Sequence, residues 1–156
     1  MPREISAGII IYKKEKDRDG KIEPKYLMLY HGGGYWNFPK GKLEQDERSF
    51  NAALREVGEE TGIPAGSLRM APNFRVTDKY IYQREGQKIF KIVIFFLAQT
   101  SQSEIKVSFE HEGYAWFPYR DALKHTSHKN IKIILKRAND FLRRKNLPQN
   151  SQNTQK

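Results

Sequence analysis

Runs of β-branched and alternating apolar residues predict the first strands of this chain. Residues 5–12 are small and β-branched and predict a strand, and residues 25–31 alternate well enough to be its returning partner. The charged stretch between them, residues 13–24, contains Asp19-Gly20, a turn signal that indicates a long hairpin loop. Three consecutive glycines, residues 32–34, then predict a turn, because the Lys-Ser/Thr ending of a phosphate-binding loop does not follow them.

A helix is predicted from Asp46 to Thr61, after a short aromatic strand at residues 35–39 and a glycine-containing loop. Asp46 is a favourable N-cap, and Glu47 places a negative charge in the first turn, where the helix dipole favours it. Gly62 is positioned to end the helix, because glycine readily adopts the left-handed conformation that often follows a helix.

The second half of the chain predicts more strands and a closing helix. Four strand-like stretches follow the first helix, at residues 68–76, 78–83, 88–100 and 112–117. The middle two of these stretches are expected to form a hairpin, and residues 119–125 one or two helical turns. A final amphipathic helix is indicated by apolar residues at helical spacing, namely Ile131, Ile134, Leu135, Ala138, Phe141 and Leu142.

Strands on both sides of one central helix, with a last helix that packs on the sheet, predict an α/β sandwich. No internal repeat and no linker divides the chain, so residues 1–145 are expected to form a single domain. Residues 146–156 are polar and are predicted to be a disordered tail.

Composition narrows the class of partner. The net charge of +10, from 28 Lys and Arg against 18 Asp and Glu, favours nucleotides, RNA or inositol phosphates, although solubility alone would explain it equally well. The absence of cysteine excludes disulfides and thiolate metal sites. Apolar runs are too short to span a membrane and the first residues lack a signal-peptide stretch. We therefore expect a cytoplasmic protein with no membrane association and no obligate protein partner.

Three carboxylates gather on one side of the first predicted helix. Glu56, Glu59 and Glu60 fall within an arc of roughly 100°, because each helical residue advances by about that angle. Carboxylates so placed repel one another, and a hard divalent cation with oxygen ligands would relieve the repulsion. A solvated acidic face is the alternative. That alternative leaves unexplained the flanking Gly41, which allows a tight approach of the loop, and Gly62, which ends the helix.

From residue 41 to residue 63 the chain resembles the complete Nudix box. The fixed positions of that box are filled, in order, by Gly41, Glu47, Arg55-Glu56-Val57, Glu59-Glu60 and Gly62-Ile63. The resemblance implies an α/β/α sandwich with a mixed sheet, a catalytic loop and helix, and a C-terminal helix. It also implies hydrolysis of a nucleoside diphosphate that is linked to another moiety.

The same resemblance implies roles for the box residues. Glu56, Glu59 and Glu60 would be ligands of Mg²⁺, with Mn²⁺ as the alternative ion, and Glu59 and Glu60 would also be catalytic. Arg55 and Glu47 would hold the loop and the helix together through a charge contact, and Glu47 would reach the metal through water. A metal ion in such a site polarises phosphoryl oxygens and lowers the pKa of a bound water.

Two segments outside the box are similar to the asymmetric diadenosine tetraphosphate hydrolases. Residues 35–41 read Tyr-Trp-Asn-Phe-Pro-Lys-Gly, like the segment that enters the box in those enzymes, and residues 108–116 resemble a late segment. Carried over to this chain, Glu110 would assist the metals or act as the base, and Tyr114 would stack on adenine. Trp116 alternates with Tyr114 along the same strand and is interpreted as a core residue.

Further substrate contacts are expected from tyrosines and lysines near these segments. Tyr80 or Tyr82 is the candidate for the opposite face of an adenine stack, and packing against a neighbouring strand fits their positions equally well. Lys40, Lys42 and Lys88 are candidates for phosphate contacts, because lysines act as point charges on phosphate.

The predicted reaction is therefore hydrolysis of diadenosine tetraphosphate to ATP and AMP. An RNA 5′-end pyrophosphohydrolase is the main alternative, since an RNA backbone rewards many lysines and arginines. A diphosphoinositol polyphosphate hydrolase has weaker motif support, and a non-catalytic nucleotide-binding domain would typically lack box carboxylates that are all present here. The chain departs from the subfamily at Lys42, where histidine is common, and at Gln45-Asp46, where Pro-Gly is usual.

Overall fold

Two long parallel strands form the centre of this computed structural model, which describes residues 1–145. β1 (Arg3–Lys16) and β7 (Gln87–Gln99) pair in parallel, and the other pairings of the eight-stranded sheet are antiparallel. The remaining strands are β2 (Ile22–Tyr30), β3 (Trp36–Asn37), β4 (Lys40–Lys42), β5 (Arg69–Met70), β6 (Val76–Arg84) and β8 (Gly113–Pro118). The sheet is therefore mixed, as the family resemblance implied.

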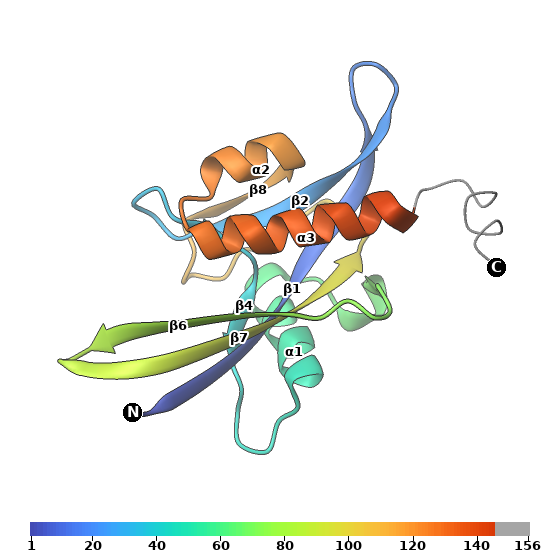
Figure 1. Ribbon diagram of the computed structural model, residues 1–156. Helices are drawn as coiled ribbons and strands as arrows, with labels where there is room; N and C mark the ends of the chain where they lie inside the picture. The colour runs from blue at the N-terminus through green and yellow to red at the C-terminus, as the bar shows by residue number, and fades with distance from the viewer. Residues whose placement is uncertain (146–156) are drawn as a thin grey trace, which may run out of the picture.

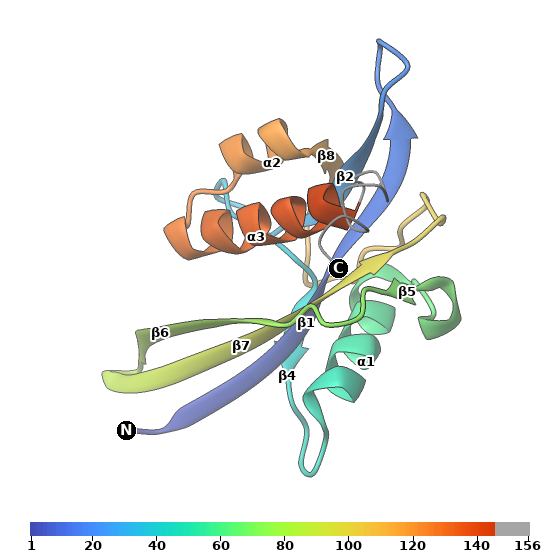
Figure 2. The same ribbon diagram turned by 45° about the vertical axis from the view of Figure 1, so that its right-hand side comes forward.

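Helices cover both faces of this sheet (Figures 1 and 2). α1 (Ser49–Thr61) packs on one face and α3 (Lys129–Lys145) on the other, where the short α2 (Tyr119–His125) also lies. Alternate residues of β1 contribute to the two layers: Ile10 belongs to the core under α3, and Ile9 to the core under α1. A strand buried on both faces is continuously apolar. The predicted α/β/α sandwich is thus confirmed.

The β1–β2 hairpin is longer than the sequence indicated. Strand pairing continues to Lys16↔Ile22, so the loop is much shorter than the predicted residues 13–24. The charged residues are part of the sheet, where Glu15 and Lys25 form a cross-strand ion pair at 3.6 Å. Opposite charges on neighbouring strands favour strand pairing. The prediction of a loop from the charged residues did not take this into account.

The start of α1 was predicted wrongly. The helix begins after Arg48, which makes no side-chain capping bond, and Asp46 lies in the preceding turn with a left-handed φ of 62°. Glu47 is likewise outside the helix, because its carboxylate accepts the N–H of Glu44 at 2.9 Å and so stabilises the turn. The predicted end is confirmed, since Gly62 has a φ of 76° and closes the helix.

Two other segments differ in strand content. Residues 40–42, expected to be loop, form β4 and pair with residues 6–8 of β1. Residues 68–76 were expected to be one strand. Instead, β5 at residues 69–70 pairs with β7, a turn follows in which Asn73 has a φ of 67°, and β6 begins at residue 76.

Among residues 1–145, no helix combines the length and apolar character needed to cross a membrane. The predicted tail, residues 146–156, lies outside the described residues. The single-domain boundary and the cytoplasmic location stay predictions.

Candidate active site

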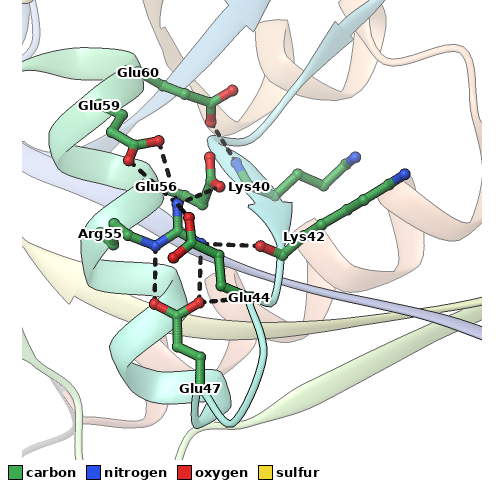
Figure 3. A network of polar contacts seen from close by, with 8 residues as sticks. All are labelled: Lys40, Lys42, Glu44, Glu47, Arg55, Glu56, Glu59 and Glu60. Carbon is green, nitrogen blue, oxygen red and sulfur yellow. Dashed lines mark hydrogen bonds and ion pairs between the residues drawn. The ribbon is translucent and has the colours of Figure 1, made fainter.

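Arg55 is the centre of the polar network drawn in Figure 3. Its guanidinium binds both carboxylate oxygens of Glu47, at 2.8 and 2.9 Å, and donates to the carbonyl of Lys42 at 3.0 Å. The same group reaches Glu56 at 2.9 Å and Glu59 at 3.2 Å. The loop before α1 is thereby tied to the helix, and the structure brings together the Glu47–Arg55 pair that the box resemblance implied.

Glu60 is the most deeply buried of the box carboxylates. Its Oε1 accepts the backbone N–H of Lys40 at 2.7 Å, and its Oε2 lies 3.2 Å from Nε2 of His111. Burial raises the pKa of Glu60 to about 8, and the negative charges of Glu56 and Glu110 raise it further. With this pKa, the Glu60 carboxyl is mostly protonated at neutral pH in the absence of a metal ion.

Gly41 lies where β4 meets the carboxylate of Glu56. A Cβ at position 41 would overlap that carboxylate, so only glycine lets Glu56 occupy the space between α1 and β4. The Glu56 side chain is 14% exposed, and this burial raises the pKa of its carboxyl. The predicted tight approach at Gly41 thus has a specific partner.

The box carboxylates are engaged with protein partners in this structure. Within residues 1–145, no three acidic, histidine or cysteine side chains converge closely enough to hold a metal ion. The donor set nevertheless fits a hard divalent cation, because its members are carboxylates, and a cation would offset the burial and repulsion that raise the pKa of Glu56 and Glu60.

A cavity of about 680 Å³ lies beside this network, between β4, the β6–β7 hairpin and the start of α3. Its aromatic and cationic lining residues are Tyr35, Tyr80, Tyr82, Phe95, His128, Lys40, Lys42, Lys91 and Lys129. The rings of Tyr80 and Tyr82 lie 6.2 Å apart, and Figure 3 shows the side chains of Lys40 and Lys42 extending away from α1. Aromatic faces beside amines suit a base and its phosphates.

Four of the six predicted substrate contacts therefore meet in one cavity, namely Lys40, Lys42, Tyr80 and Tyr82. Lys88 and Tyr114 do not line it. Lys88 pairs with Gln83 near the tip of the β6–β7 hairpin. Tyr114 lies on β8, pairs with Leu29 of β2, and is 39% exposed.

Two further predicted residues, Glu110 and Trp116, lie in the loop before β8 and on β8 itself. Glu110 contributes negative charge that raises the pKa of Glu56 and of Glu60. Trp116 packs against the core under α1, as interpreted from the sequence, and its indole N–H donates to the carbonyl of Ser103 at 3.0 Å.

His111 is a site residue to which the sequence gave no role. Burial lowers its pKa, and the ring lies between two oxygens, with Nε2 3.2 Å from Oε2 of Glu60 and Nδ1 3.1 Å from the Ser108 hydroxyl oxygen. The cavity residues Glu4 and Lys91 were also missed. Lys91 carried a usable signal, since a lysine in an otherwise apolar strand indicates a buried charge.

Comparison with known proteins agrees with this geometry. The NUDIX domain model matches residues 2–138. The asymmetrical bis(5′-nucleosyl)-tetraphosphatase of Sus scrofa is 32% identical over 142 residues, which cover 88% of this chain and 94% of that protein. An mRNA-decapping protein, g5R of African swine fever virus, is 37% identical over 68 residues, 44% of this chain and 26% of that protein.

A solved structure supports the same assignment. The binary complex of the Caenorhabditis elegans Ap4A hydrolase superposes with a TM-score of 0.75 and 28% identity, over 89% of this chain and 97% of that one. With the box residues in place on the matching fold, the chain belongs to the NUDIX family.

Proposed function

We propose that this chain hydrolyses a phosphoanhydride bond of a nucleoside polyphosphate, and that its substrate is diadenosine tetraphosphate, cleaved to ATP and AMP. The observation that carries the proposal is the position of Lys40. Its backbone N–H binds Glu60 at 2.7 Å, while its side chain lines the cavity. Phosphates bound to this lysine would therefore lie beside the box carboxylates.

The aromatic part of the cavity suits a nucleobase. Tyr80 is 37% exposed and Tyr82 lies next to it, while Tyr35 and His128 meet edge to face at 4.9 Å on the same lining. Stacking on such rings contributes about 1–3 kcal/mol per base. Tyr114 lies outside the cavity, so we assign it only to a part of the substrate that extends beyond it.

The proposed metal ligands are Glu56, Glu59 and Glu60 with Glu110, and the proposed ion is Mg²⁺, with Mn²⁺ as the alternative. A bound ion supplies polarisation of phosphoryl oxygens and a water of lowered pKa. Lys40 binds the phosphates, which neutralises part of their charge as phosphoryl transfer requires.

Protein groups hold these carboxylates in place. Arg55 and Glu47 fix the loop against α1 through two hydrogen bonds at 2.8 and 2.9 Å. Glu60 is held by the Lys40 amide and faces His111. Such contacts to ligating carboxylates orient them and are typically worth 10–100-fold in metal affinity or activity.

Hydrolysis of an RNA 5′ end is the second candidate. The similarity to the viral mRNA-decapping protein and the net charge of +10 favour it, because an RNA backbone is attracted by many lysines and arginines. The aromatic lining of the cavity favours the dinucleotide instead.

Product analysis separates the two candidates. The purified protein is incubated with Mg²⁺ and either diadenosine tetraphosphate or a 5′-triphosphorylated RNA oligomer, and the products are resolved by chromatography. ATP and AMP in equal amounts, with intact RNA and no turnover in EDTA, are expected. Release of phosphate or pyrophosphate from the RNA, with an intact dinucleotide, would contradict the proposal and select the second candidate.

A further inference from the structure

Glu4, near the start of β1, receives four donors from neighbouring elements. Its Oε1 accepts from the Tyr82 hydroxyl at 2.6 Å and lies 3.5 Å from Nζ of Lys91. Its Oε2 lies 2.8 Å from the Arg84 guanidinium and 3.2 Å from Nζ of Lys42. We call these five residues the basic cluster. Figures 1 and 2 show why they meet, since β1 begins beside the β6–β7 hairpin.

The basic cluster carries more positive charge than Glu4 can balance. Three cations surround one carboxylate, which leaves an excess of two positive charges. The Lys91 side chain is only 7% exposed, so water does little to solvate its charge. The hydrogen bond from Tyr82, assisted by Lys42 and Arg84, lowers the pKa of Glu4 to about 2, so Glu4 stays ionised.

Most of the basic cluster lines the cavity. Glu4, Lys42, Tyr82 and Lys91 all line it, and Arg84 extends from the same hairpin and is 51% exposed. An anion in the cavity would meet the same amines and hydroxyl that now contact the carboxylate. Four donors that converge on one oxygen acid form the arrangement in which proteins bind a phosphate group.

We propose that Glu4 is an internal counter-anion that occupies a phosphate-binding subsite, and that a phosphate of the substrate takes its place among Lys42, Arg84 and Lys91. The inference rests on the proposed function for the identity of the ligand, a nucleoside polyphosphate. Glu4 thereby sets the affinity of the cavity for phosphate, because every incoming phosphate must work against its negative charge.

A purely structural role for Glu4 makes the opposite prediction. If Glu4 only neutralises Lys91 and ties β1 to the β6–β7 hairpin, loss of its charge would leave the surrounding cations less well ordered. The affinity for phosphate would then stay the same or decrease. The two roles are separated by Glu4→Gln, because glutamine keeps the acceptor for Tyr82 and removes only the charge.

The test is a calorimetric titration of the full-length protein with inorganic tripolyphosphate, in EDTA and at low ionic strength. Glu4→Gln is expected to bind about tenfold more tightly than wild type, the effect of removing one charge several ångströms from a multivalent anion. The matched control is Glu23→Gln, which removes the same charge at the far end of the β1–β2 hairpin. Glu23 lies roughly 35 Å from Glu4, measured along the strands. Equal or weaker binding by Glu4→Gln, relative to this control, would overturn the proposal.

A second variant keeps the test decisive if Glu4→Gln fails to fold. Arg84 is half exposed, and in Arg84→Gln the Glu4 carboxylate keeps Lys42 and Lys91 as partners. The proposal expects this variant to bind tripolyphosphate several-fold more weakly than wild type, and unchanged affinity would overturn it.

The titration needs neither metal nor turnover, so its outcome is independent of the substrate assignment. A protein that ignores diadenosine tetraphosphate but shows the gain in Glu4→Gln would retain the subsite and lose the proposed function. A protein that cleaves diadenosine tetraphosphate without that gain would lose only the subsite.

Discussion

The carboxylates around Arg55, which we call the acidic network, and the basic cluster around Glu4 are opposite in composition. Around Arg55 one guanidinium faces four carboxylates, whereas around Glu4 one carboxylate faces three cations. Lys42 joins the two, because its carbonyl accepts from Arg55 and its amine pairs with Glu4 at 3.2 Å. Each cluster contains one internal ion of the opposite sign, and each retains an excess charge that a ligand of the opposite sign would balance.

The difference teaches what the ligand must carry. The acidic network has an excess of negative charge and suits a divalent cation. The basic cluster has an excess of positive charge and suits phosphate. A polyphosphate with its metal ion supplies both charges at once, and β4 places the two clusters side by side to receive it.

The metal-binding role of the acidic network is tested most directly by Glu60→Gln. Removing a proposed metal ligand is expected to lower kcat for the substrate on the order of a thousandfold, the loss of about 4 kcal/mol of charge stabilisation. Steady-state kinetics with unfolding curves on the same samples provides the measurement. The matched control is Glu44→Gln, which removes a 70% exposed carboxylate of the same network and should retain most activity. Full activity in Glu60→Gln would refute the metal assignment.

The raised pKa of Glu60 predicts a pH dependence of stability in the absence of metal. The native group keeps its proton up to about pH 8, whereas the unfolded group loses it near its ordinary pKa of 4.5. The stabilisation is complete below about pH 4.5 and is lost as pH rises toward 8, by at most about 1.4 kcal/mol per pH unit. Urea unfolding in EDTA from pH 5 to pH 8 measures this slope, and Glu60→Gln should flatten it. Identical slopes in the two proteins would contradict the burial argument.

The contact between β4 and α1 is tested by Gly41→Ala. The new Cβ would displace the Glu56 carboxylate, so metal affinity is expected to fall about 10–100-fold. Gly66→Ala is the control, because a Cβ there meets no atom within 4 Å. A Gly41→Ala protein with wild-type affinity for metal would show that the position of Glu56 does not matter.

The smallest expected effect is a change in helix stability at Gly58, a residue that carries no charge of the network. Gly58 lies inside α1, and a Cβ there would have its nearest contact at 3.9 Å from the Ile63 carbonyl oxygen. Gly58→Ala should therefore raise the free energy of unfolding by about 0.5–1 kcal/mol, because alanine loses less conformational freedom in a helix. Denaturant titration measures the change, and a destabilised variant would contradict the open space seen beside Gly58.

The sequence predicted features that depend on local spacing. Glu56, Glu59 and Glu60 share a helix face because of the helical repeat, and Gly62 ends the helix because of its own conformational freedom. The apolar patterns also identified most of the strands and the closing helix, and the Nudix resemblance implied the α/β/α sandwich that the structure shows.

Features that depend on distant residues were not predictable. Glu4 looks like an ordinary charge near the first residues, and its role depends on a parallel pairing that brings β1 beside β7. His111 was present in a recognised segment, yet its contact with Glu60 exists only once the loop folds over α1. Asp46 has an N-cap residue type, but the Glu47–Arg55 bonds determine where the helix begins.

The central claim is that the box carboxylates hold a divalent ion. It is tested most directly by titrating the substrate-free protein with Mn²⁺ and following the free ion by electron paramagnetic resonance. The account predicts saturable binding by wild type and an affinity at least about tenfold weaker in Glu60→Gln. Equal Mn²⁺ affinity in the two proteins would contradict the claim, because Glu60 would then contribute nothing to the ion.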